Sequence, residues 1–521
     1  MVRLSIVSIT SRTISLELEN KECFYTKNRM YLYINGVKSG ETGTNVFIIK
    51  DLKADSKYTV YVEDSVTKEK SNEITVTTKS ESMVVNVKDF GAKGDGVKVD
   101  TASIQAAIAA CRQGGRVFFP EGTYLVSPIF LKSDITIELG KDARLLGEKD
   151  REKYPVLPGL ISSHIAGEAY YLASWEGEPA ASFASLITGI AVKNVSITGE
   201  GIIDGNADYD NWWHDVKNKI TAWRPRTIFL NKCENILIEG ITVTNSPSWT
   251  LHTLLSQNIK VVGVNIENPK DAPNTDGFDP ESCSNVLVLG TRFSVGDDCI
   301  AIKSGKFSTS RKYFAPSSDI YIRNCLMEFG HGAVVIGSEM SGGVRNVYVE
   351  KCMFSSTDRG IRIKTRRGRG DTGVVDEIHA ANLIMNNVKT PFTVNCFYFC
   401  DADGKTEYVW SKEKLPVDDR TPFIGSIYIK DVHCTGTKVA AGFIYGLPER
   451  KIEKLVLENI HIHFDAAAEA DYPEMLSFAE PMCREGFYFN NIKKLALKNI
   501  TLENSVGIQS VKLNIDSEEI L

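Results

Sequence analysis

The sequence predicts an all-β protein, a right-handed parallel β-helix preceded by a small N-terminal β-sandwich domain. Two observations carry this prediction. Residues 1–80 are rich in Lys, Thr and Ser, whereas from about residue 85 onward short apolar runs recur at spacings of roughly 20 to 50 residues. Such strands stack as coils, because a single repeat cannot bury its own apolar face. We therefore expect two domains, residues 1–80 and residues 81–521.

The N-terminal segment shows short alternating strands, such as residues 14–18 and 31–34, separated by turn residues. Residues 52–61 and 74–78 resemble the end of a fibronectin type III domain, with Tyr58 in the tyrosine-corner position. No cluster of exposed aromatic residues is evident, so we expect a spacer or docking module rather than a carbohydrate-binding domain.

In the second segment the short apolar runs often begin at an asparagine. These asparagines are Asn194, Asn235, Asn258, Asn285 and Asn346, and runs without the asparagine continue at Ile320, Ile427, Leu455 and Leu495. Residues 100–111 instead predict a helix with Asp100 as its N-cap and one apolar face. We expect this helix to cover the open end of the solenoid.

The composition excludes several classes of protein. Hydrophobic residues make up 43% and charged residues 24% of the chain, as in ordinary globular proteins. A net charge of -6 and an isoelectric point near 5.9 give no overall attraction for nucleic acid or an anionic membrane. No apolar run reaches the ~18 residues of a membrane span. A polyanionic partner would therefore need a local cationic patch.

The cysteines and the first residues bear on location. The eleven cysteines are scattered from Cys23 to Cys483 without metal-ligand spacing, which favours buried thiols over a disulfide framework. The first residues alternate into Ser and Thr and show no secretory signal peptide. We therefore expect a cytoplasmic location, with a secreted or periplasmic one as the alternative.

Three aspartates are the candidate catalytic residues. Asp276 follows Asn274 and Thr275, and the adjacent Asp297 and Asp298 come about one coil later. Corresponding positions on adjacent coils lie about 4.8 Å apart, so the carboxylates would share one small area. Their mutual repulsion would raise at least one pKa, so that one carboxyl group can donate a proton while another activates water. Each motif alone would more often be a loop corner than a site, because Asn, Asp and Gly are turn residues.

Two further motifs continue the coil spacing. His331 lies between Gly330 and Gly332, and glycine neighbours offer no packing for a core histidine and allow a close backbone approach.

In the second motif, strand alternation sends Arg362 and Lys364 to one face and Ile363 to the other. Aligned with the acidic cluster, these two cations suggest recognition of a substrate carboxylate. Arg366, Arg367 and Arg369 would extend the cationic patch, although some could be exposed loop charges.

These motifs, in this order, resemble the four-part signature of the polygalacturonases of glycoside hydrolase family 28. The four parts are Asn274-Thr275-Asp276, Gly296-Asp297-Asp298, Gly330-His331-Gly332 and Arg362-Ile363-Lys364. The resemblance spans roughly residues 85–500, and residues 87–96 and 245–249 support it. Residues 87–96 are similar to a segment that lyases and phage tailspikes share, so this segment supports the fold more than the reaction.

The resemblance implies hydrolysis of α-linked polygalacturonate with inversion. Asp297 would be the general acid, and Asp276 and Asp298 would activate the attacking water. His331 would tune their protonation, while Arg362 and Lys364, with Asn274 nearby, would bind galacturonate. Neighbouring strand residues point to opposite faces, so we expect a bulge or turn at Asp297 and Asp298, permitted by Gly296. Inverting enzymes usually separate their carboxyl groups by about 6.5–9.5 Å, and coil stacking predicts a closer cluster here.

Alternatives remain at this stage. A pectate lyase could use the aspartates as calcium ligands, a non-catalytic β-helix could bind glycans, and a hydrolase could prefer rhamnogalacturonan or xylogalacturonan. We expect an exo-acting enzyme that releases galacturonate from the non-reducing end, with endo attack as the alternative. Inserts at residues 151–185 and 205–226 offer aromatic residues to close one end of the cleft: Tyr170, Tyr171, Trp175, Trp212, Trp213 and Trp223. No cofactor or metal is expected, and the oligomeric state stays open.

Overall fold

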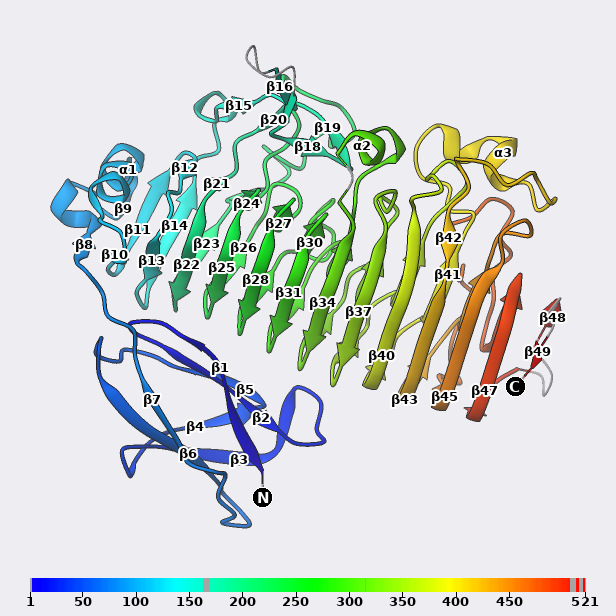
Figure 1. The fold of residues 1–521 in the computed structure, drawn as a ribbon, viewed down its shortest axis with the longest axis horizontal. Coiled ribbons are helices and arrows are strands. Elements are labelled where there is room, and N and C mark those ends of the chain that lie inside the picture. Colours follow the sequence, from blue (N-terminus) through cyan, green and yellow to red (C-terminus); the bar gives the residue numbers. More distant parts are fainter. Residues whose placement is uncertain (1, 163–168, 314, 507–511, 515–518, 521) are drawn as a thin grey trace.

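The computed structural model describes residues 2–162, 169–313, 315–506, 512–514 and 519–520. Residues 163–168 of the first predicted insert lie outside the described residues. The chain forms a long stack of coils with a small β-domain beside its first half (Figure 1). The predicted parallel β-helix is confirmed, because strands of successive coils pair in parallel and in register, as Ile236, Ile259 and Val286 do.

Each complete coil contributes a strand to three faces. The first face comprises β8(Val84–Asn86), β10(Gly115–Phe119), β13(Ile135–Leu139), β22(Lys193–Gly199), β25(Glu234–Glu239), β28(Gln257–Val262), β31(Ser284–Leu289), β34(Ser317–Arg323), β37(Val344–Glu350), β40(Val374–Asn386), β42(Phe423–Ile424), β43(Ser426–Thr437), β45(Ile452–Phe464), β47(Ile492–Glu503) and β49(Glu519–Ile520). The second face comprises β9(Asp95–Val99), β11(Gly122–Val126), β14(Ala143–Gly147), β23(Ile202–Asp204), β26(Thr242–Thr244), β29(Asn265–Glu267), β32(Arg292–Ser294), β35(Leu326–Glu328) and β38(Met353–Ser355), after which it merges into the long strand β40.

The third face carries the candidate site. It comprises β12(Ile129–Phe130), β21(Ile187–Ile190), β24(Ile228–Asn231), β27(Leu251–Leu254), β30(Phe278–Glu281), β33(Ile300–Ile302), β36(Val334–Ile336), β39(Arg359–Lys364), β41(Thr390–Asn395), β44(Ala440–Tyr445), β46(Glu485–Asn490) and β48(Lys512–Asn514). One continuous apolar core runs between the three faces from Val85 to Leu495.

The recurring asparagines have a structural reason. Asn235, Asn258 and Asn285 adopt φ values of 58°, 57° and 53° at the start of their strands, a left-handed conformation that asparagine tolerates better than most residues. Their side chains also form a ladder between coils, in which Asn258 Nδ2 donates to Asn235 Oδ1 over 2.9 Å. The sequence pattern therefore marks turns that are bonded to one another.

The predicted helix is α1(Thr101–Ala110), which packs Ile104, Ala107 and Ile108 onto the first coils. Figure 1 shows it at the N-terminal end of the solenoid, as expected. Asp100 occupies the predicted N-cap position, but its side chain makes no capping hydrogen bond. Its carboxylate instead accepts hydrogen bonds from the backbone N–H groups of Lys93 and Gly94, and so closes the preceding loop.

The N-terminal domain consists of two antiparallel sheets that enclose their own core. One sheet has the order β1-β2-β5 and the other β4-β3-β6-β7. The strands are β1(Arg3–Ile9), β2(Ile14–Glu19), β3(Tyr25–Ile34), β4(Val37–Thr44), β5(Val46–Ile49), β6(Lys57–Asp64) and β7(Ile74–Thr77). The Tyr58 hydroxyl accepts a hydrogen bond from Lys53 N over 2.9 Å, five residues upstream.

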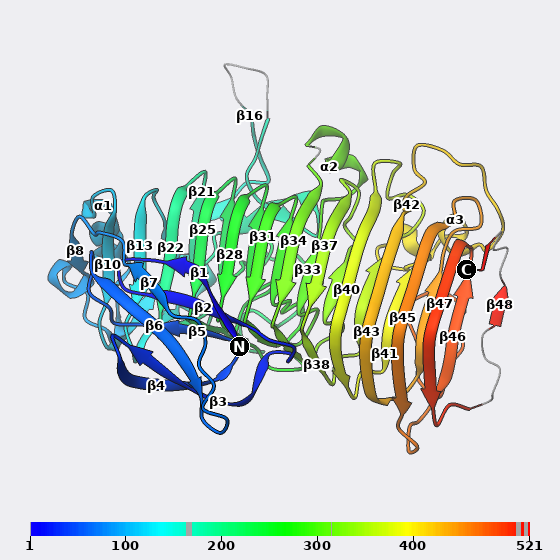
Figure 2. The same ribbon diagram turned by 60° about the horizontal axis from the view of Figure 1, so that its bottom comes forward.

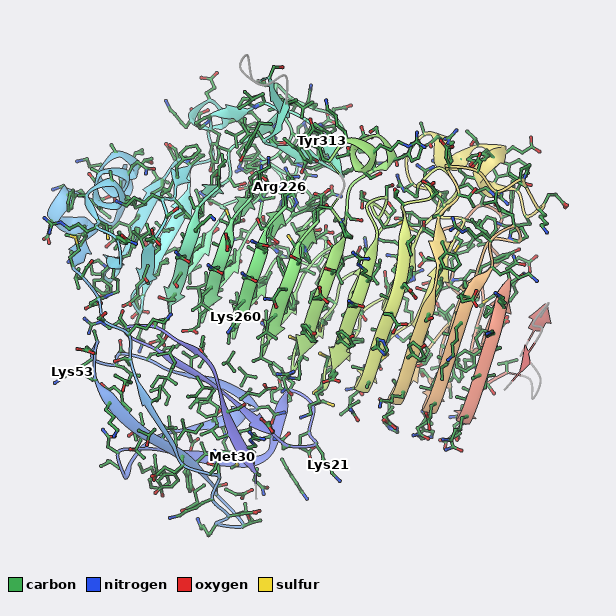
Figure 3. All side chains as sticks on the ribbon, viewed as in Figure 1. Lys21, Met30, Lys53, Arg226, Lys260 and Tyr313 are labelled. Atoms are coloured by element: carbon green, nitrogen blue, oxygen red, sulfur yellow. The ribbon has the colours of Figure 1, made fainter. Side chains whose placement is uncertain are left out.

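This domain lies against the outer side of the first face (Figure 2). Glu239 at the end of β25 is buried and accepts hydrogen bonds from the hydroxyls of Ser8, Thr13 and Ser15. Lys260 of β28 reaches the same domain and donates to Val7 O over 2.9 Å (Figure 3). The N-terminal domain is thus docked by specific polar contacts.

The inserts and remaining elements lie outside the coils. They contain β15(Val156–Leu157), β16(Leu160–Ser162), β17(Ala169–Tyr171), β18(Ser174–Trp175), β19(Glu178–Pro179), β20(Ser182–Phe183), α2(Phe307–Lys312), α3(Glu407–Trp410), and the 3-10 turns η1(Val87–Phe90), η2(Arg151–Lys153) and η3(Asp403–Lys405). Among the described residues, no helix combines the length and apolar character needed to cross a membrane. All eleven cysteines are free thiols, and nine of them are buried, which confirms the expectation of buried thiols for those nine.

Candidate active site

Three of the four predicted motifs lie just before neighbouring strands on the third face, and the fourth lies within the next strand. Residues 274–277 lead into β30, residues 296–298 into β33, and residues 330–332 into β36, while Arg362 and Lys364 lie in β39. These strands are successive neighbours in the sheet. The coil register expected from the sequence is therefore confirmed.

Glycines allow the backbone of these turns to crowd together. A Cβ on Gly296 would lie 2.3 Å from the carbonyl oxygen of Ala272, and one on Gly330 would lie 2.3 Å from that of Asp297. Gly330 also has φ +83°, a conformation that L side chains rarely adopt. The chain bends at Gly296 and Asp297 between β32 and β33, which is the turn expected to bring Asp297 and Asp298 to the same side.

The three aspartates form a compact cluster. Asp276, Asp297 and Asp298 each have a carboxylate oxygen within 4.8 Å of the others, closer than the separation usual in inverting enzymes. The side chains of Asp276 and Asp298 are only 5% and 2% exposed, whereas that of Asp297 is 22% exposed. Asp297 is therefore the carboxylate that faces the cleft.

Asp298 is held by two buried cations. Lys364 Nζ donates to its Oδ2 over 2.7 Å, and Arg362 Nη1 donates to its Oδ1 over 3.4 Å. Arg362 Nε also donates to Glu474 Oε2 over 2.8 Å, and Nη2 pairs with the second oxygen of Glu474. Ile363 points into the core, so the predicted alternation is confirmed. The two cations, expected to bind substrate, are committed in this structure to Asp298 and Glu474.

Asp297 forms an ion pair with His331. His331 Nδ1 lies 3.1 Å from Asp297 Oδ1, and the histidine side chain is 56% exposed. Burial raises the pKa of Asp297, but the hydrogen bond and charge of His331, with Lys364 and Lys303, outweigh it and bring the pKa to about 2. The same hydrogen bond raises the pKa of His331 against the effect of burial. In the substrate-free site an ionised Asp297 therefore faces a protonated imidazolium of His331.

Asp276 has the opposite charge tendency. Burial, followed by the nearby charges of Asp279 and Asp297, raises the pKa of Asp276 well above its ordinary value, and Lys303 partly opposes the rise. The expected raised pKa within the cluster is therefore present, but it falls on Asp276 rather than on Asp297, the predicted general acid. Asp297 lacks it because His331 lies within hydrogen-bond distance, at 3.1 Å, whereas Lys303, the cation paired with Asp276, lies 3.9 Å away.

A cleft of about 550 Å³ opens in front of Asp297. Trp175, Trp223, Lys217, Lys270 and His331 are among its lining residues. The rings of Trp175 and Trp223 are stacked, with centroids 4.6 Å apart. Asn274 also lines the cleft, and its Oδ1 accepts a hydrogen bond from Arg224 Nη2 over 2.6 Å.

Sequence comparisons now bear on this geometry. The sequence profile of glycosyl hydrolases family 28 matches residues 161–419, and a profile described as rhamnogalacturonase A/epimerase, pectate lyase-like, matches residues 84–141. A probable polygalacturonase from Vitis vinifera is 33% identical over 391 residues, which are 73% of this chain and 74% of that protein. The chain belongs to glycosyl hydrolase family 28.

Several proteins named as exo-acting enzymes are also similar to this chain. The exo-poly-alpha-D-galacturonosidase of Dickeya chrysanthemi is 29% identical over 417 residues, covering 70% of this chain and 66% of that protein. The crystal structure of an exopolygalacturonase from Thermotoga maritima aligns with a TM-score of 0.66 and 28% identity, over 81% of this chain and 92% of that one. The fold also matches a family 28 exopolygalacturonase from Yersinia enterocolitica, with a TM-score of 0.66 and 20% identity over 96% of both chains.

This family 28 chain places other predicted residues away from the cleft. Trp212 and Trp213 are buried in a separate apolar cluster, and Tyr171 packs on Tyr313. The predicted cationic extension by Arg366, Arg367 and Arg369 is wrong. All three guanidinium groups are buried and neutralised, Arg366 by Asp401 and Asp403, Arg369 by Asp401, and Arg367 by Glu449.

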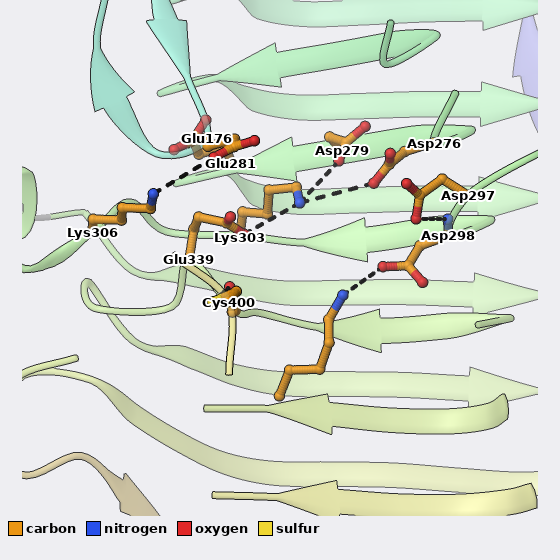
Figure 4. Close-up of polar contacts among 12 residues, drawn as sticks. Glu176, Asp276, Asp279, Glu281, Asp297, Asp298, Lys303, Lys306, Glu339 and Cys400 are labelled. Atoms are coloured by element: carbon orange, nitrogen blue, oxygen red, sulfur yellow. Dashed lines mark hydrogen bonds and ion pairs between the residues drawn. The ribbon is translucent and has the colours of Figure 1, made fainter. Parts of the chain in front are cut away.

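Four charged residues of the site were not predicted from the sequence. Lys303 and Asp279 lie beside Asp276, Glu339 lies on the far side of Lys303 (Figure 4), and Glu474 pairs with Arg362. Strand alternation offered a signal for two of them, because the core residues Ile300, Ile302 and Phe278 force Lys303 and Asp279 outward. Glu474 had none, since it comes from a loop 112 residues beyond Arg362.

The aspartate cluster has counter-charges within the family 28 chain itself. Among the described residues it is the one group of three or more metal-ligating side chains with donor atoms this close. His331 pairs with Asp297, Lys364 and Arg362 with Asp298, and Lys303 lies 3.9 Å from Asp276. Protein cations therefore do the neutralising that a bound metal ion would otherwise do.

Proposed function

We propose that this chain is an exo-acting polygalacturonase, which hydrolyses α-1,4-galacturonosidic bonds of polygalacturonate or oligogalacturonides with inversion and releases galacturonate from the non-reducing end. The observation that carries the proposal is the compact set of Asp276, Asp297 and Asp298, of which Asp297 lines the cleft and pairs with His331. Membership of family 28 and the similar exo-acting proteins support it.

Asp297 acts as the general acid, because it is the exposed carboxylate of the three. Its low pKa in the free site means that the proton rests 3.1 Å away, on His331. A bound sugar carries negative charge and displaces water, and both effects favour the neutral carboxyl group. The proton then passes from His331 Nδ1 to Asp297 and from Asp297 to the glycosidic oxygen.

Asp276 and Asp298 activate the attacking water. Asp298 accepts hydrogen bonds from Lys364 and Arg362, which fix its orientation, so it orients the water as an acceptor. Asp276 takes the proton of that water, and its raised pKa makes it a stronger base once it is ionised. Both are nearly sealed from solvent, so a single ordered water suffices.

Lys217 and Lys270 supply the cationic patch for a polyanionic substrate, because they line the cleft. Asn274 lines the same cleft. Arg362 and Lys364 act on the substrate chiefly through Asp298, since their donors already bind that carboxylate and Glu474. Trp175 and Trp223 offer an apolar face against which a sugar ring can pack.

Ion pairs beside the cleft favour exo attack, because Glu176 lines the cleft and Lys306 joins it to Asp401. Lys306 Nζ lies 3.8 Å from Glu176 and 3.1 Å from Asp401, and Lys306 N donates to Gly177 O over 3.0 Å. The first insert is thereby tied to the coil that carries Lys303 and to the segment around residue 401 (Figure 4). We propose that this connection closes one end of the cleft, so that a sugar chain cannot run through and only its terminal residue is cleaved.

The N-terminal domain is best described as fibronectin type III-like. Its sheet orders, three strands against four, fit that arrangement, and the Tyr58 hydrogen bond to Lys53 N fits a tyrosine corner. Its polar contacts with β25 and β28 favour a docking role. The eleven free thiols favour a reducing, cytoplasmic compartment, which labelled-protein fractionation in the source cells would test.

The product profile tests the proposed function. Purified protein is incubated with trigalacturonate and with polygalacturonate, and products are separated over time while ultraviolet absorbance is recorded. Galacturonate from the first time point, without mid-size fragments, is the expected result. Early mixed oligomers would indicate endo attack, rising absorbance a lyase, and cleavage of only rhamnogalacturonan or xylogalacturonan a different hydrolase specificity.

A further inference from the structure

A single buried lysine serves several carboxylates behind the catalytic cluster. Lys303 Nζ lies 3.9 Å from Asp276 Oδ2, 3.5 Å from Asp279 Oδ1 and 3.3 Å from Glu339 Oε2. The ammonium also lies 4.5 Å from the centroid of the Trp249 ring. Figure 4 shows Lys303 between Asp276 and Asp279 on one side and Glu339 on the other.

Lys303 is fixed in this place by the coil that follows β33. Its backbone N–H donates to Pro280 O, and its carbonyl accepts from Ser282 N and from the Ser317 hydroxyl. The side chain is buried and is absent from the lining of the cleft. Lys303 therefore cannot contact the substrate in this structure, and any effect it has on the reaction passes through Asp276.

The charges around Lys303 do not balance. Asp279 and Glu281 are buried on β30 beside Asp276, and Glu339 is buried after β36. Neither oxygen of Asp279 has a hydrogen-bond partner among the described residues. Because a buried carboxylate stays ionised only beside a cation or strong donors, these groups compete for one ammonium.

We propose that Lys303 is a positioning residue that makes Asp276 available as an ionised base, and that Asp279 and Glu339 limit this effect by competing for the same ammonium. The inference rests on the proposed function and deepens it. It attributes the protonation state of Asp276, the water-activating carboxylate, to residues that lie outside the four motifs.

The direction of each titration agrees with this competition. Burial raises the pKa of Glu339, but Lys303 and then Lys306 outweigh it and hold this pKa well below its ordinary value. Burial raises the pKa of Asp279 to about 8 despite the opposing charge of Lys303. Glu339 thus interacts most strongly with the Lys303 ammonium group, and Asp276 keeps a raised pKa.

Other groups face the two residues as well. Those that interact with Asp276 are Asp279, Asp297, Asp298, Lys303, Cys299 and Arg224. Those that interact with Lys303 are Asp276, Asp279, Glu281, Asp298, Glu339, Glu176, His252, Asp297 and Lys364. Of these cations, only Lys303 lowers the pKa of Asp276 as a main cause.

The test is the pH dependence of kcat for release of galacturonate from trigalacturonate. Lys303→Met should move the acidic limb upward by about one pH unit or more, because Asp276 loses the cation that lowers its pKa. Asp279→Asn and Glu339→Gln should move the same limb downward, since each removes a competing carboxylate. KM should stay within about twofold of wild type in all three, as none of these side chains lines the cleft.

The matched control is Lys493→Met, which removes a lysine paired with Glu453 on the outer surface. It should leave the limb in place. An unmoved limb in Lys303→Met, or movement of all three variants in the same direction, would overturn the proposal. Should Lys303→Met fail to fold, the two carboxamide variants still decide by their sign. Wild-type protein that releases no galacturonate would instead overturn the proposed function.

Discussion

Lys364 donates from Nζ to Asp298 Oδ2 over 2.7 Å, in a place where both side chains are buried. The lysine comes from β39 and the aspartate from the turn before β33, so the bond spans two coils of the solenoid. A lysine at the surface could bind a substrate directly, but Lys364 is buried and binds a carboxylate of the protein itself. The contact fixes the orientation of the Asp298 carboxylate as an acceptor.

We predict that Lys364→Met lowers kcat on the order of 100-fold, because Asp298 loses its nearest donor and the order of the attacking water. Removing one partner of a buried ion pair should also lower the free energy of unfolding by about 3–5 kcal/mol. Single-turnover kinetics and chemical denaturation measure the two effects. Lys364→Arg keeps the charge and should recover part of both, and full activity in the methionine variant would contradict this role.

The Asp297–His331 pair predicts how stability depends on pH. The folded-state pKa of His331 is raised, so its contribution is complete below the unfolded value and is lost as the pH rises through the folded value. Asp297 has a depressed pKa of about 2, so its contribution is present above the unfolded value and is lost as the pH falls toward 2. Thermal melts of wild type and His331→Gln should therefore differ most between about pH 4 and 6.5. If the melting temperatures of the two proteins differed by the same amount at every pH, the stabilising role of the Asp297–His331 pair would be refuted.

The stacked tryptophans should matter for substrate binding. Trp175→Ala removes one ring of the cleft lining, and we expect KM for trigalacturonate to rise about tenfold, since aromatic contacts are worth about 0.5–1.5 kcal/mol beyond area burial. Trp213→Ala is the contrasting variant, because Trp213 is buried in a separate cluster. It should lower the melting temperature and leave KM unchanged. Identical behaviour of the two variants would show that Trp175 is only a packing residue.

Docking of the N-terminal domain should depend on Glu239. Three hydroxyls of that domain donate to its buried carboxylate, and hydrogen bonds to charged groups contribute about 1.5–3 kcal/mol each. Glu239→Ala should therefore separate one calorimetric unfolding transition into two, while kcat stays unchanged. Glu234→Ala, an exposed-surface change on the same strand, is the control that should keep one transition.

The sequence predicted the solenoid because each turn is determined by residues close to it in the chain. Asn235, Asn258 and Asn285 mark left-handed turns, and the apolar residues after them fill one continuous core. The same regular spacing placed Asp276, Asp297 and His331 together. The positions that follow from the regular coil spacing could therefore be predicted from the sequence.

Long-range partners could not be read in this way. Glu474 reaches Arg362 from a distant loop, and Arg366 and Arg369 share Asp401 within a folded network. A cationic run looks the same in sequence whether it faces solvent or buried carboxylates. The charge state of Asp276 likewise depends on Lys303 and Glu339, which meet only after the coils have stacked.

The most direct test of the central claim is the anomeric configuration of the first galacturonate released, followed by proton NMR before mutarotation. A cluster in which Asp297 protonates the leaving oxygen while Asp276 and Asp298 activate water must invert the α-linkage. With inversion, β-galacturonate appears first, and Asp297→Asn releases none. Initial α-galacturonate would mean a covalent intermediate on one of these aspartates and would contradict the account.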